Sequence, residues 1–344
     1  MTTDLDRYIR QMRYPPFGEA GQKRLAESRV LLCGCGALGS VLANTLARAG
    51  VGFLRLVDRD FLEFNNLQRQ VLYDEADVAA GLPKAIAAQA KLRAINSQIE
   101  IEAVVADVDA SNIAALCADV DLLLDGTDNF ETRFLLNDAA LQFNKPWVYG
   151  GCIGAEGQTM TILPGETACL RCLMLDAPPP GTTPTCDTAG IFGPIVNVVA
   201  SFQAMEAIKI LSGHRDAISR SLTVIEMWEN RIRQVDLSKL REATDCPACK
   251  RSEFDWLSGR RGSQTAVLCG RNAVQLSHMT DSPISLDALA AQLAEVGRVT
   301  RNAYLLRLAV EPYQITVFPD GRAIIAGTDD IAEAKTVYAR YIGS

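Results

Sequence analysis

Short apolar runs alternate with helix-length segments along the first half of the chain. The runs predict strands at Val30–Leu32 and Phe53–Val57, and within residues 99–108, 120–129 and 146–154. The segments between these runs have helical patterns, as in the alanine-rich stretch that follows Pro83. Strands and helices that alternate in this way predict an α/β fold, with a Rossmann-like, mainly parallel sheet and helices on both faces.

The alternation loosens after residue 155. Residues 157–165 are predicted to form a strand of an antiparallel pair, and another strand is expected within residues 222–229. Residues 177–194 are rich in proline, glycine and threonine, which predicts an exposed loop. The helix expected at Ile195–Leu211 has apolar residues at helical spacing. These elements predict an antiparallel extension of the parallel sheet.

Composition also changes near residue 256. Residues 256–266, with the sequence WLSGRRGSQTA, are polar and contain glycine, which is typical of a linker. We therefore expect one domain at 1–255, with halves at about 1–155 and 156–255, and a small α+β domain at 267–344.

A glycine-rich turn joins the first predicted strand to the helix after it. Gly34, Gly36 and Gly39 form Gly-x-Gly-x-x-Gly, the fingerprint of dinucleotide-binding folds, whose glycines allow a tight turn and a close approach to a nucleotide. Asp58 ends the next strand, 19 residues after Gly39, where an acidic side chain can meet a ribose hydroxyl. This stretch predicts a nucleotide site but does not specify the reaction.

Several charged residues suit a phosphate ligand. Lys84 lies at a predicted helix N-terminus, where a lysine opposes the helix dipole. An exposed side chain is the usual fate of lysine, but an anion shared with the helix end explains the position better. Asp128 and Asn129 follow a strand end, where such residues often form turns or caps, and Asp128 is well placed to hold Mg²⁺. Arg10 is able to reach a phosphate in the same or a neighbouring subunit.

Charge and composition exclude several classes of protein. The net charge of −7 gives no general attraction to nucleic acid or to anionic membranes. The chain has no run of about 18 apolar residues, and its N-terminus is polar without a signal pattern. We therefore expect a cytoplasmic protein. With only His214 and His278, histidine-based acid–base chemistry is not expected.

Four of the ten cysteines form two Cys-x-x-Cys pairs, Cys169/Cys172 and Cys246/Cys249. Two such pairs can close a tetrahedral four-thiolate zinc site. The 73 residues between the pairs exceed the spacing of a zinc ribbon, so the fold must bring them together. The alternative is a redox dithiol, which fits less well because neither pair is predicted to open a helix after a strand. Four protein ligands leave no open position, so the predicted Zn²⁺ is structural.

Nine short motifs occur in a fixed order over about residues 5–250: RYIRQ, GCGALG, LVD, NNLQRQ, GLPKA, DGTDN, CLRC, AMEAIK and CPAC. This ordered set resembles the ThiF/MoeB/HesA family, the bacterial relatives of ubiquitin-activating enzymes. The length and the C-terminal extension are similar to those of the longer ThiF type. One departure is Ala37, where the family often has another glycine.

The resemblance implies ATP-dependent adenylation of the C-terminal glycine of a ubiquitin-like sulfur carrier ending in Gly-Gly. The glycine loop and Asp58 would hold adenosine and ribose, and residues 156–255 would bind the carrier. Asn66, Arg69 and Lys84 would hold phosphates, and Asp128 would bind Mg²⁺. Arg10 would reach the partner subunit's ATP, which implies a homodimer. Cys186 resembles the loop cysteine that joins the carrier in ThiF-type members, through a thioester or through an acyl disulfide that requires a sulfur donor.

Three alternatives stay open at this point. The first is an activating enzyme for a bacterial ubiquitin-like conjugation system, because carriers for thiamine thiazole, molybdopterin and conjugation are all activated in the same way. The second is an NAD-dependent oxidoreductase, which explains the glycines and Asp58 but leaves Arg69, Lys84 and the cysteine pairs without roles. The third is a non-catalytic zinc module that binds a carrier through its last domain.

Overall fold

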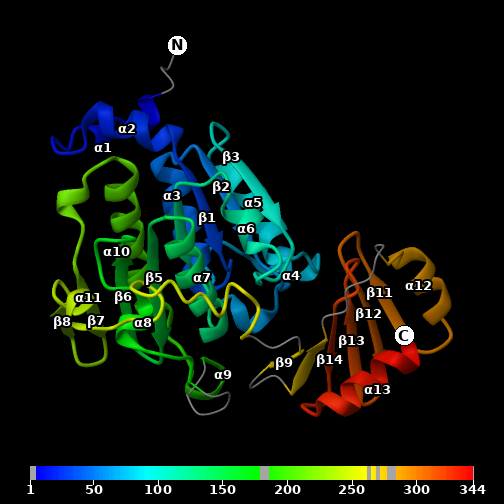
Figure 1. Ribbon diagram of the computed structural model, residues 1–344. Helices are drawn as coiled ribbons and strands as arrows, with labels where there is room; N and C mark the ends of the chain where they lie inside the picture. The colour runs from blue at the N-terminus through cyan, green and yellow to red at the C-terminus, as the bar shows by residue number, and fades with distance from the viewer. Residues whose placement is uncertain (1–4, 179–185, 262–264, 269–271, 277–283, 344) are drawn as a thin grey trace. The chain divides into compact units, whose positions relative to one another are not determined.

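The computed structural model describes residues 5–178, 186–261, 265–268, 272–276 and 284–343 (Figure 1). The chain divides into two units, Met1–Arg261 and Gly262–Ser344. The first unit extends beyond the boundary expected at residue 255, because Trp256 and Leu257 pack in its core. The apolar side chains of WLSGRR therefore belong to the fold that precedes them.

An eight-stranded sheet organises the first unit, in the order β3-β2-β1-β4-β5-β6-β7-β8. Its strands are β1 (Arg29–Cys33), β2 (Phe53–Val57), β3 (Glu100–Val104), β4 (Leu122–Asp125), β5 (Trp147–Ile153), β6 (Glu156–Ile162), β7 (Ser221–Glu226) and β8 (Arg231–Asp236). The pairs from β3 to β5 are parallel and those from β5 to β8 are antiparallel. The predicted mainly parallel sheet with an antiparallel extension is confirmed.

Helices cover both faces of this sheet (Figure 1). The long ones are α2 (Gly18–Glu27), α3 (Ala37–Ala49), α5 (Lys84–Ile95), α7 (Phe130–Gln142) and α10 (Gly193–Leu211). The short ones are η1 (Asp6–Tyr8), α1 (Ile9–Met12), η2 (Phe64–Asn66), α4 (Glu75–Ala79), α6 (Ile113–Cys117), α8 (Leu170–Leu173), α9 (Cys186–Ala189), η3 (Arg215–Ala217) and α11 (Leu240–Ala243).

Two hydrophobic cores lie on opposite faces of the sheet. Val30 and Leu32 of β1 pack with α3, α5 and α10, whereas Leu31 and Cys33 pack with α6 and α7. Successive strand side chains point to opposite faces, so a strand that is apolar at every position must be covered on both sides. This explains why β1 and β4 are continuous apolar runs.

Helix α10 is long and apolar enough to cross a membrane, yet it packs as a core helix. It contacts α3, β5 and β6, and half of its most apolar window is buried inside the protein. Gln203 on this helix is fully buried, and its Nε2 donates to the main-chain oxygen of Asp125 at 2.9 Å. The burial of α10 against the sheet accounts for its composition.

The second unit contains a six-stranded antiparallel sheet in the order β11-β12-β13-β14-β10-β9. Its strands are β9 (Thr265–Leu268), β10 (Ala273–Leu276), β11 (Arg298–Arg301), β12 (Leu306–Val310), β13 (Tyr313–Val317) and β14 (Ala323–Ala326), and its helices are α12 (Leu286–Leu293) and α13 (Ile331–Tyr341). The predicted small α+β fold is confirmed, although no sequence pattern predicts β11. The Arg-Val-Thr-Arg sequence of β11 is mostly exposed and has no apolar alternation.

Asp138 of α7 lies in the core of the first unit beside Trp256. It is fully buried, and its Oδ2 accepts a hydrogen bond from the backbone N–H of Trp256 at 3.1 Å. Among the described residues, its Oδ1 has no hydrogen-bond partner. Burial raises the pKa of Asp138 to about 6, against the hydrogen bond from Trp256 and the charge of Arg171.

This raised pKa predicts how the stability of the fold depends on pH. The unfolded carboxyl ionises near pH 4 and the folded one near pH 6, so folding loses stability as pH rises through this window. Two pKa units correspond to about 3 kcal/mol. Asp138→Asn should lack this loss, so its free energy of unfolding relative to wild type should increase by up to about 3 kcal/mol between pH 4 and pH 7. Urea unfolding at both pH values measures the difference.

The exposed carboxylate of Asp216, in η3, provides the matched control. Asp216→Asn should keep a constant difference from wild type across the same pH range. An equally constant difference for Asp138→Asn would show that Asp138 titrates as it does in the unfolded chain.

Candidate functional site

The glycine-rich turn connects β1 to α3 at the carboxyl edge of the parallel sheet. Gly34 has a φ of +90°, and a Cβ there would lie 2.5 Å from the main-chain oxygen of Gly126. A Cβ on Gly39 would lie 1.9 Å from the main-chain oxygen of Gly34. Both positions therefore require glycine. Around Gly36 there is more room, because the nearest atom to an added Cβ is 3.8 Å away.

Helix α3 begins immediately after this turn, with Gly36 as its N-cap residue and Ala37 as its first residue. Ala37 has a helical backbone, so alanine is accommodated here without strain. The first N–H groups of a helix have no partner within it and can bind an anion. The turn therefore presents backbone donors at the sheet edge where α/β proteins bind ligands.

Asp58 links the end of β2 to this turn. Its Oδ2 accepts from the backbone N–H of Cys35 at 2.6 Å, and its Oδ1 accepts from the N–H of Asp60 at 2.7 Å. Burial raises the pKa of Asp58, while the positive charge of Lys84 opposes that shift. Asp58, the residue predicted to bind the ribose, therefore lies against the glycine turn and helps to hold the turn in place.

Lys84 is buried, not exposed as most lysines are. Only 4% of its surface is accessible, and its Nζ lies 3.0 Å from Oδ2 of Asp60. It is the first residue of α5, and its backbone N–H donates to the main-chain oxygen of Asp60 at 2.8 Å. Burial of an ammonium group is costly unless it is paired. Asp60 provides that pairing and fixes Lys84 close to Asp58.

The NNLQRQ segment, which precedes Lys84 in the chain, begins in a 3-10 turn and continues as a loop. Asn66 is 2% exposed; its Oδ1 accepts from the N–H of Glu63, and its Nδ2 donates to Oδ1 of Asn65. The guanidinium of Arg69 is partly exposed and donates to the main-chain oxygen of Asn65 at 2.8 Å. The side chain of Asn66 thus stabilises the turn, whereas the Arg69 guanidinium keeps further donors for a ligand.

In the DGTDN segment, Asp125 and Asn129 stabilise the local structure, whereas Asp128 is exposed. Asp125 is fully buried; its carboxylate accepts from Nε of Arg133 at 3.2 Å and from the hydroxyl and N–H of Thr127. The side chain of Asn129 caps α7 by accepting from the N–H of Thr132. Asp128, held between these two anchors, is exposed. Its negative charge also raises the pKa of Arg59, whose main carboxylate neighbours are Asp107 and Asp60.

The structure brings some of the predicted residues together and leaves others apart. Asp58, Lys84 and the glycine turn form one cluster, and Asp128 and Asn129 follow the neighbouring strand β4. Arg10 is exposed on α1 in the N-terminal segment. Cys186 is the first residue of α9, and its side chain lies outside the described part of the structure.

Three residues beside this cluster were not singled out from the sequence. Arg59 pairs with Asp107 through NH1 at 2.6 Å. Gln70 is 3% exposed, and its amide lies beside Gly36. Tyr73 donates its hydroxyl proton toward the main-chain oxygen of Cys35 at 2.7 Å. The sequence signals for these residues were the place of Gln70 inside NNLQRQ and the proximity of the other two to Asp58 or to that motif, and neither signal says which way a side chain points.

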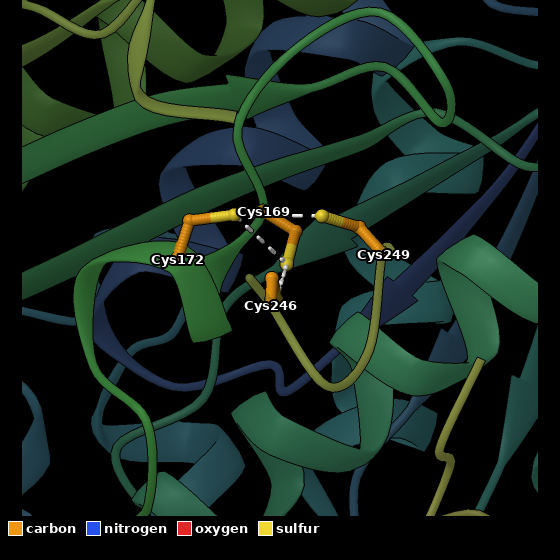
Figure 2. A group of neighbouring side chains, drawn as sticks. All are labelled: Cys169, Cys172, Cys246 and Cys249. Carbon is orange, nitrogen blue, oxygen red and sulfur yellow. Dashed lines mark hydrogen bonds between the residues drawn. The ribbon is translucent and has the colours of Figure 1, made fainter. Parts of the chain in front are cut away.

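The four paired cysteines converge into a second site (Figure 2). Their sulfur atoms all lie within 4.8 Å of one another. The distances are 3.8 Å for Cys169–Cys172, 3.6 Å for Cys169–Cys246 and 3.5 Å for Cys172–Cys249. A tetrahedral zinc with Zn–S bonds of about 2.3 Å separates its sulfurs by about 3.8 Å. The cluster therefore fits a four-thiolate metal site.

One argument against a redox role for these cysteines was wrong in detail. Cys169 does open a helix, because it is the N-cap residue of α8. That helix has only four residues, however, and each sulfur of the first pair has a neighbour from the second. A two-cysteine redox site would not need the other pair, so a metal site remains the better interpretation.

Known proteins resemble this chain over most of its length. The model of the ThiF family matches residues 8–248. The sulfur carrier protein ThiS adenylyltransferase of Bacillus subtilis is 45% identical over 98% of this chain and 99% of its own length. The SAMP-activating enzyme E1 of Haloferax volcanii is 40% identical over 74% of this chain and 92% of its own length. The crystal structure of E. coli MccB with ATP has a TM-score of 0.60 at 24% identity, covers 72% of this chain and 74% of that chain, and supports the fold.

Proposed function

Because the chain belongs to the ThiF family and is an adenylyltransferase, we propose that it uses ATP to activate the C-terminal glycine of a ubiquitin-like sulfur-carrier protein. The observation that carries this proposal is the 45% identity with a ThiS adenylyltransferase over nearly the full length of both chains. Neither the oxidoreductase nor the non-catalytic zinc module explains that similarity.

The proposed reaction needs little acid–base chemistry. The carboxylate of the carrier's last glycine attacks the α-phosphorus of ATP, the bond between that phosphorus and the bridging oxygen breaks, and pyrophosphate leaves. The product is an acyl adenylate. Because the nucleophile is already ionised, catalysis depends on positioning and on the neutralisation of phosphate charge. A site with lysine, arginine and carboxylate groups but without histidine suits this reaction.

Each residue of the cluster has a proposed part in this reaction. Gly34, Gly36, Ala37 and Gly39 supply the turn and the helix end that face the nucleotide, and Asp58 binds the ribose. Arg69 and Lys84 neutralise phosphate charge, with Asn66 contributing through the turn it stabilises. Asp128, an exposed carboxylate just after the end of β4, would hold Mg²⁺, which would supply positive charge beside the phosphates. Asn129 supports Asp128 by capping α7.

The proposed assembly is a cytoplasmic homodimer. Its basis is Arg10, which is exposed on α1 and, in this proposal, reaches the ATP of the partner subunit. The four-cysteine cluster holds one structural Zn²⁺ and takes no part in the reaction. The carrier binds on the half of the first unit that follows residue 155.

A second chemical step is proposed at Cys186. Its thiolate attacks the acyl adenylate, AMP leaves, and a thioester joins the carrier to the enzyme. If a persulfide donor first transfers its outer, sulfane sulfur to the Cys186 thiolate and leaves as a thiolate, the terminal sulfur of the new persulfide displaces AMP and gives an acyl disulfide instead. Either product passes the activated carrier onward for sulfur transfer.

The 40% identity with the SAMP-activating enzyme E1 favours one other candidate, an activating enzyme for a conjugated ubiquitin-like protein. Both candidates share the adenylation step and differ in the fate of the carrier. A carrier thiocarboxylate would support sulfur transfer, whereas carrier joined to other proteins would support conjugation.

Exchange of radioactive pyrophosphate into ATP tests the adenylation proposal. Wild-type protein should catalyse the exchange only when a small protein ending in Gly-Gly is present. The carrier used should be the one that co-purifies with this chain. No exchange with that protein would overturn the proposal.

Cys186→Ala separates the second step from the first. Because the thiol acts only after the acyl adenylate forms, this variant should keep pyrophosphate exchange within about twofold of wild type. It should lose the covalent carrier adduct seen on a non-reducing gel. Cys152→Ala, at a partly exposed cysteine of β5, is the matched control and should keep both. An adduct that persists in Cys186→Ala would place the nucleophile elsewhere.

A further inference from the structure

Side chains hold two successive peptide groups of the glycine turn: the Gly34–Cys35 peptide through its N–H, and the Cys35–Gly36 peptide, here called the Cys35 peptide, through its oxygen. The N–H of Cys35 donates to Oδ2 of Asp58 at 2.6 Å. The main-chain oxygen of Cys35 accepts from the hydroxyl of Tyr73 at 2.7 Å. Asp58 is already part of the proposed nucleotide site, whereas Tyr73 belongs to none of the motifs. The contact of Tyr73 is buried and that of Asp58 is partly buried.

The orientation of the Cys35 peptide affects the direction of the backbone N–H groups that follow it. The N–H of Ser40 makes the first helical hydrogen bond, to the main-chain oxygen of Gly36 at 2.9 Å. The N–H groups between Gly36 and Ser40 are left for a ligand. Because they follow the Cys35 peptide directly, a rotation of that peptide would change where they point. The hydroxyl of Tyr73 opposes such a rotation.

Tyr73 also lies beside two other parts of the cluster. Its hydroxyl is 3.3 Å from the main-chain oxygen of Lys84, the first residue of α5. Its backbone N–H donates to the main-chain oxygen of Gln70 at 3.2 Å, within the segment that carries Arg69. The phenol has a single proton, and the shorter distance assigns it to Cys35. Tyr73, which is 7% exposed, therefore contacts the turn and the start of α5 through its side chain and the Arg69 segment through its backbone.

We propose that Tyr73 is a positioning residue for the triphosphate of ATP: its hydroxyl fixes the Cys35 peptide so that the N-terminal N–H groups of α3 and Lys84 face the same phosphates. This inference rests on the proposed use of ATP. It assigns Tyr73 no contact with the reacting atoms. Burial keeps the phenol protonated by raising its pKa, so the hydroxyl remains a donor.

Tyr73→Phe removes the hydroxyl and keeps the ring in the core. The buried oxygen of Cys35 then loses its hydrogen-bond partner, and part of this loss weakens nucleotide binding. Isothermal titration with MgATP should show a dissociation constant raised about tenfold. In pyrophosphate exchange the KM for ATP should rise by the same factor with kcat within about twofold, because the turn holds substrate and transition state alike.

Tyr8→Phe is the matched control. Tyr8 is 6% exposed, and its hydroxyl accepts from Nδ2 of Asn96 at 2.8 Å, near the opposite end of α3. It should lower Tm about as much as Tyr73→Phe and leave the dissociation constant for MgATP unchanged. A wild-type dissociation constant in Tyr73→Phe, or an equal rise in both variants, would overturn the inference. If wild-type protein itself does not bind MgATP, the proposed function fails instead.

Discussion

Asp128→Ala is expected to lower the rate of adenylation by about 10³-fold or more while the protein stays folded. A metal ion at a transferring phosphate contributes several kcal/mol of charge stabilisation, and about 4 kcal/mol corresponds to 10³ in rate. In the proposed function Asp128 is the carboxylate that holds Mg²⁺, and no other residue of the cluster is assigned that role. Carrier-dependent pyrophosphate exchange at saturating MgATP measures the loss.

The fold should tolerate this change because Asp128 carries none of the local structure. Asp125 holds Arg133 and Thr127, and Asn129 caps α7, so the loop keeps its anchors. A surface substitution of this kind changes stability by about 0.5 kcal/mol or less. Asp216→Ala removes an exposed carboxylate in η3 and should keep full activity. Full exchange activity in Asp128→Ala would remove Asp128 from the metal role.

Loss of the metal from the four-cysteine cluster should have the largest effect on stability. The cluster joins the α8 segment to the loop at 246–249. In each of the two contacts between the pairs, Cys169–Cys246 and Cys172–Cys249, the cysteines are 77 residues apart in the sequence. Without a cation, four sulfurs within 4.8 Å of one another would repel once ionised. We expect metal removal or Cys246→Ser to cost about 5 kcal/mol or more and to lower Tm by about 10 °C or more.

Metal analysis and thermal unfolding together test this expectation. Purified protein should contain about one zinc per chain, and Cys246→Ser should contain none. Cys152→Ser is the control, because Cys152 lies outside the cluster. It should keep its zinc and most of its stability. Wild-type protein that is folded and free of metal would overturn the zinc assignment.

Local features of the sequence were enough to predict the architecture. The apolar runs of β1 and β4 are continuous because both faces of each strand are covered. Any residue other than glycine would clash with the backbone at Gly34 and Gly39, so the spacing of these two glycines predicts the turn. Two Cys-x-x-Cys pairs in a chain with two histidines indicate a four-thiolate metal site, provided that the fold brings the pairs together.

Other parts of the fold lacked a local signal. Strand β11 is mostly exposed and pairs only with β12, so no alternation marks it. Trp256 looked like the start of a linker because its neighbours are polar, yet its ring packs against Phe134 with centroids 5.4 Å apart. In both cases the decisive partner lies elsewhere in the chain.

The sequence by itself thus determined the parallel sheet, the position of the glycine turn, the charged residues near it and the two cysteine pairs that meet in the fold. Tertiary structure decided what each side chain does there: Lys84 is buried against Asp60, Asn66 is used within its own turn, and Tyr73 reaches Cys35. The physical reason is that turns and strand patterns depend on near neighbours. The hydrogen-bond partner of a buried polar group, however, depends on which distant segment packs beside it.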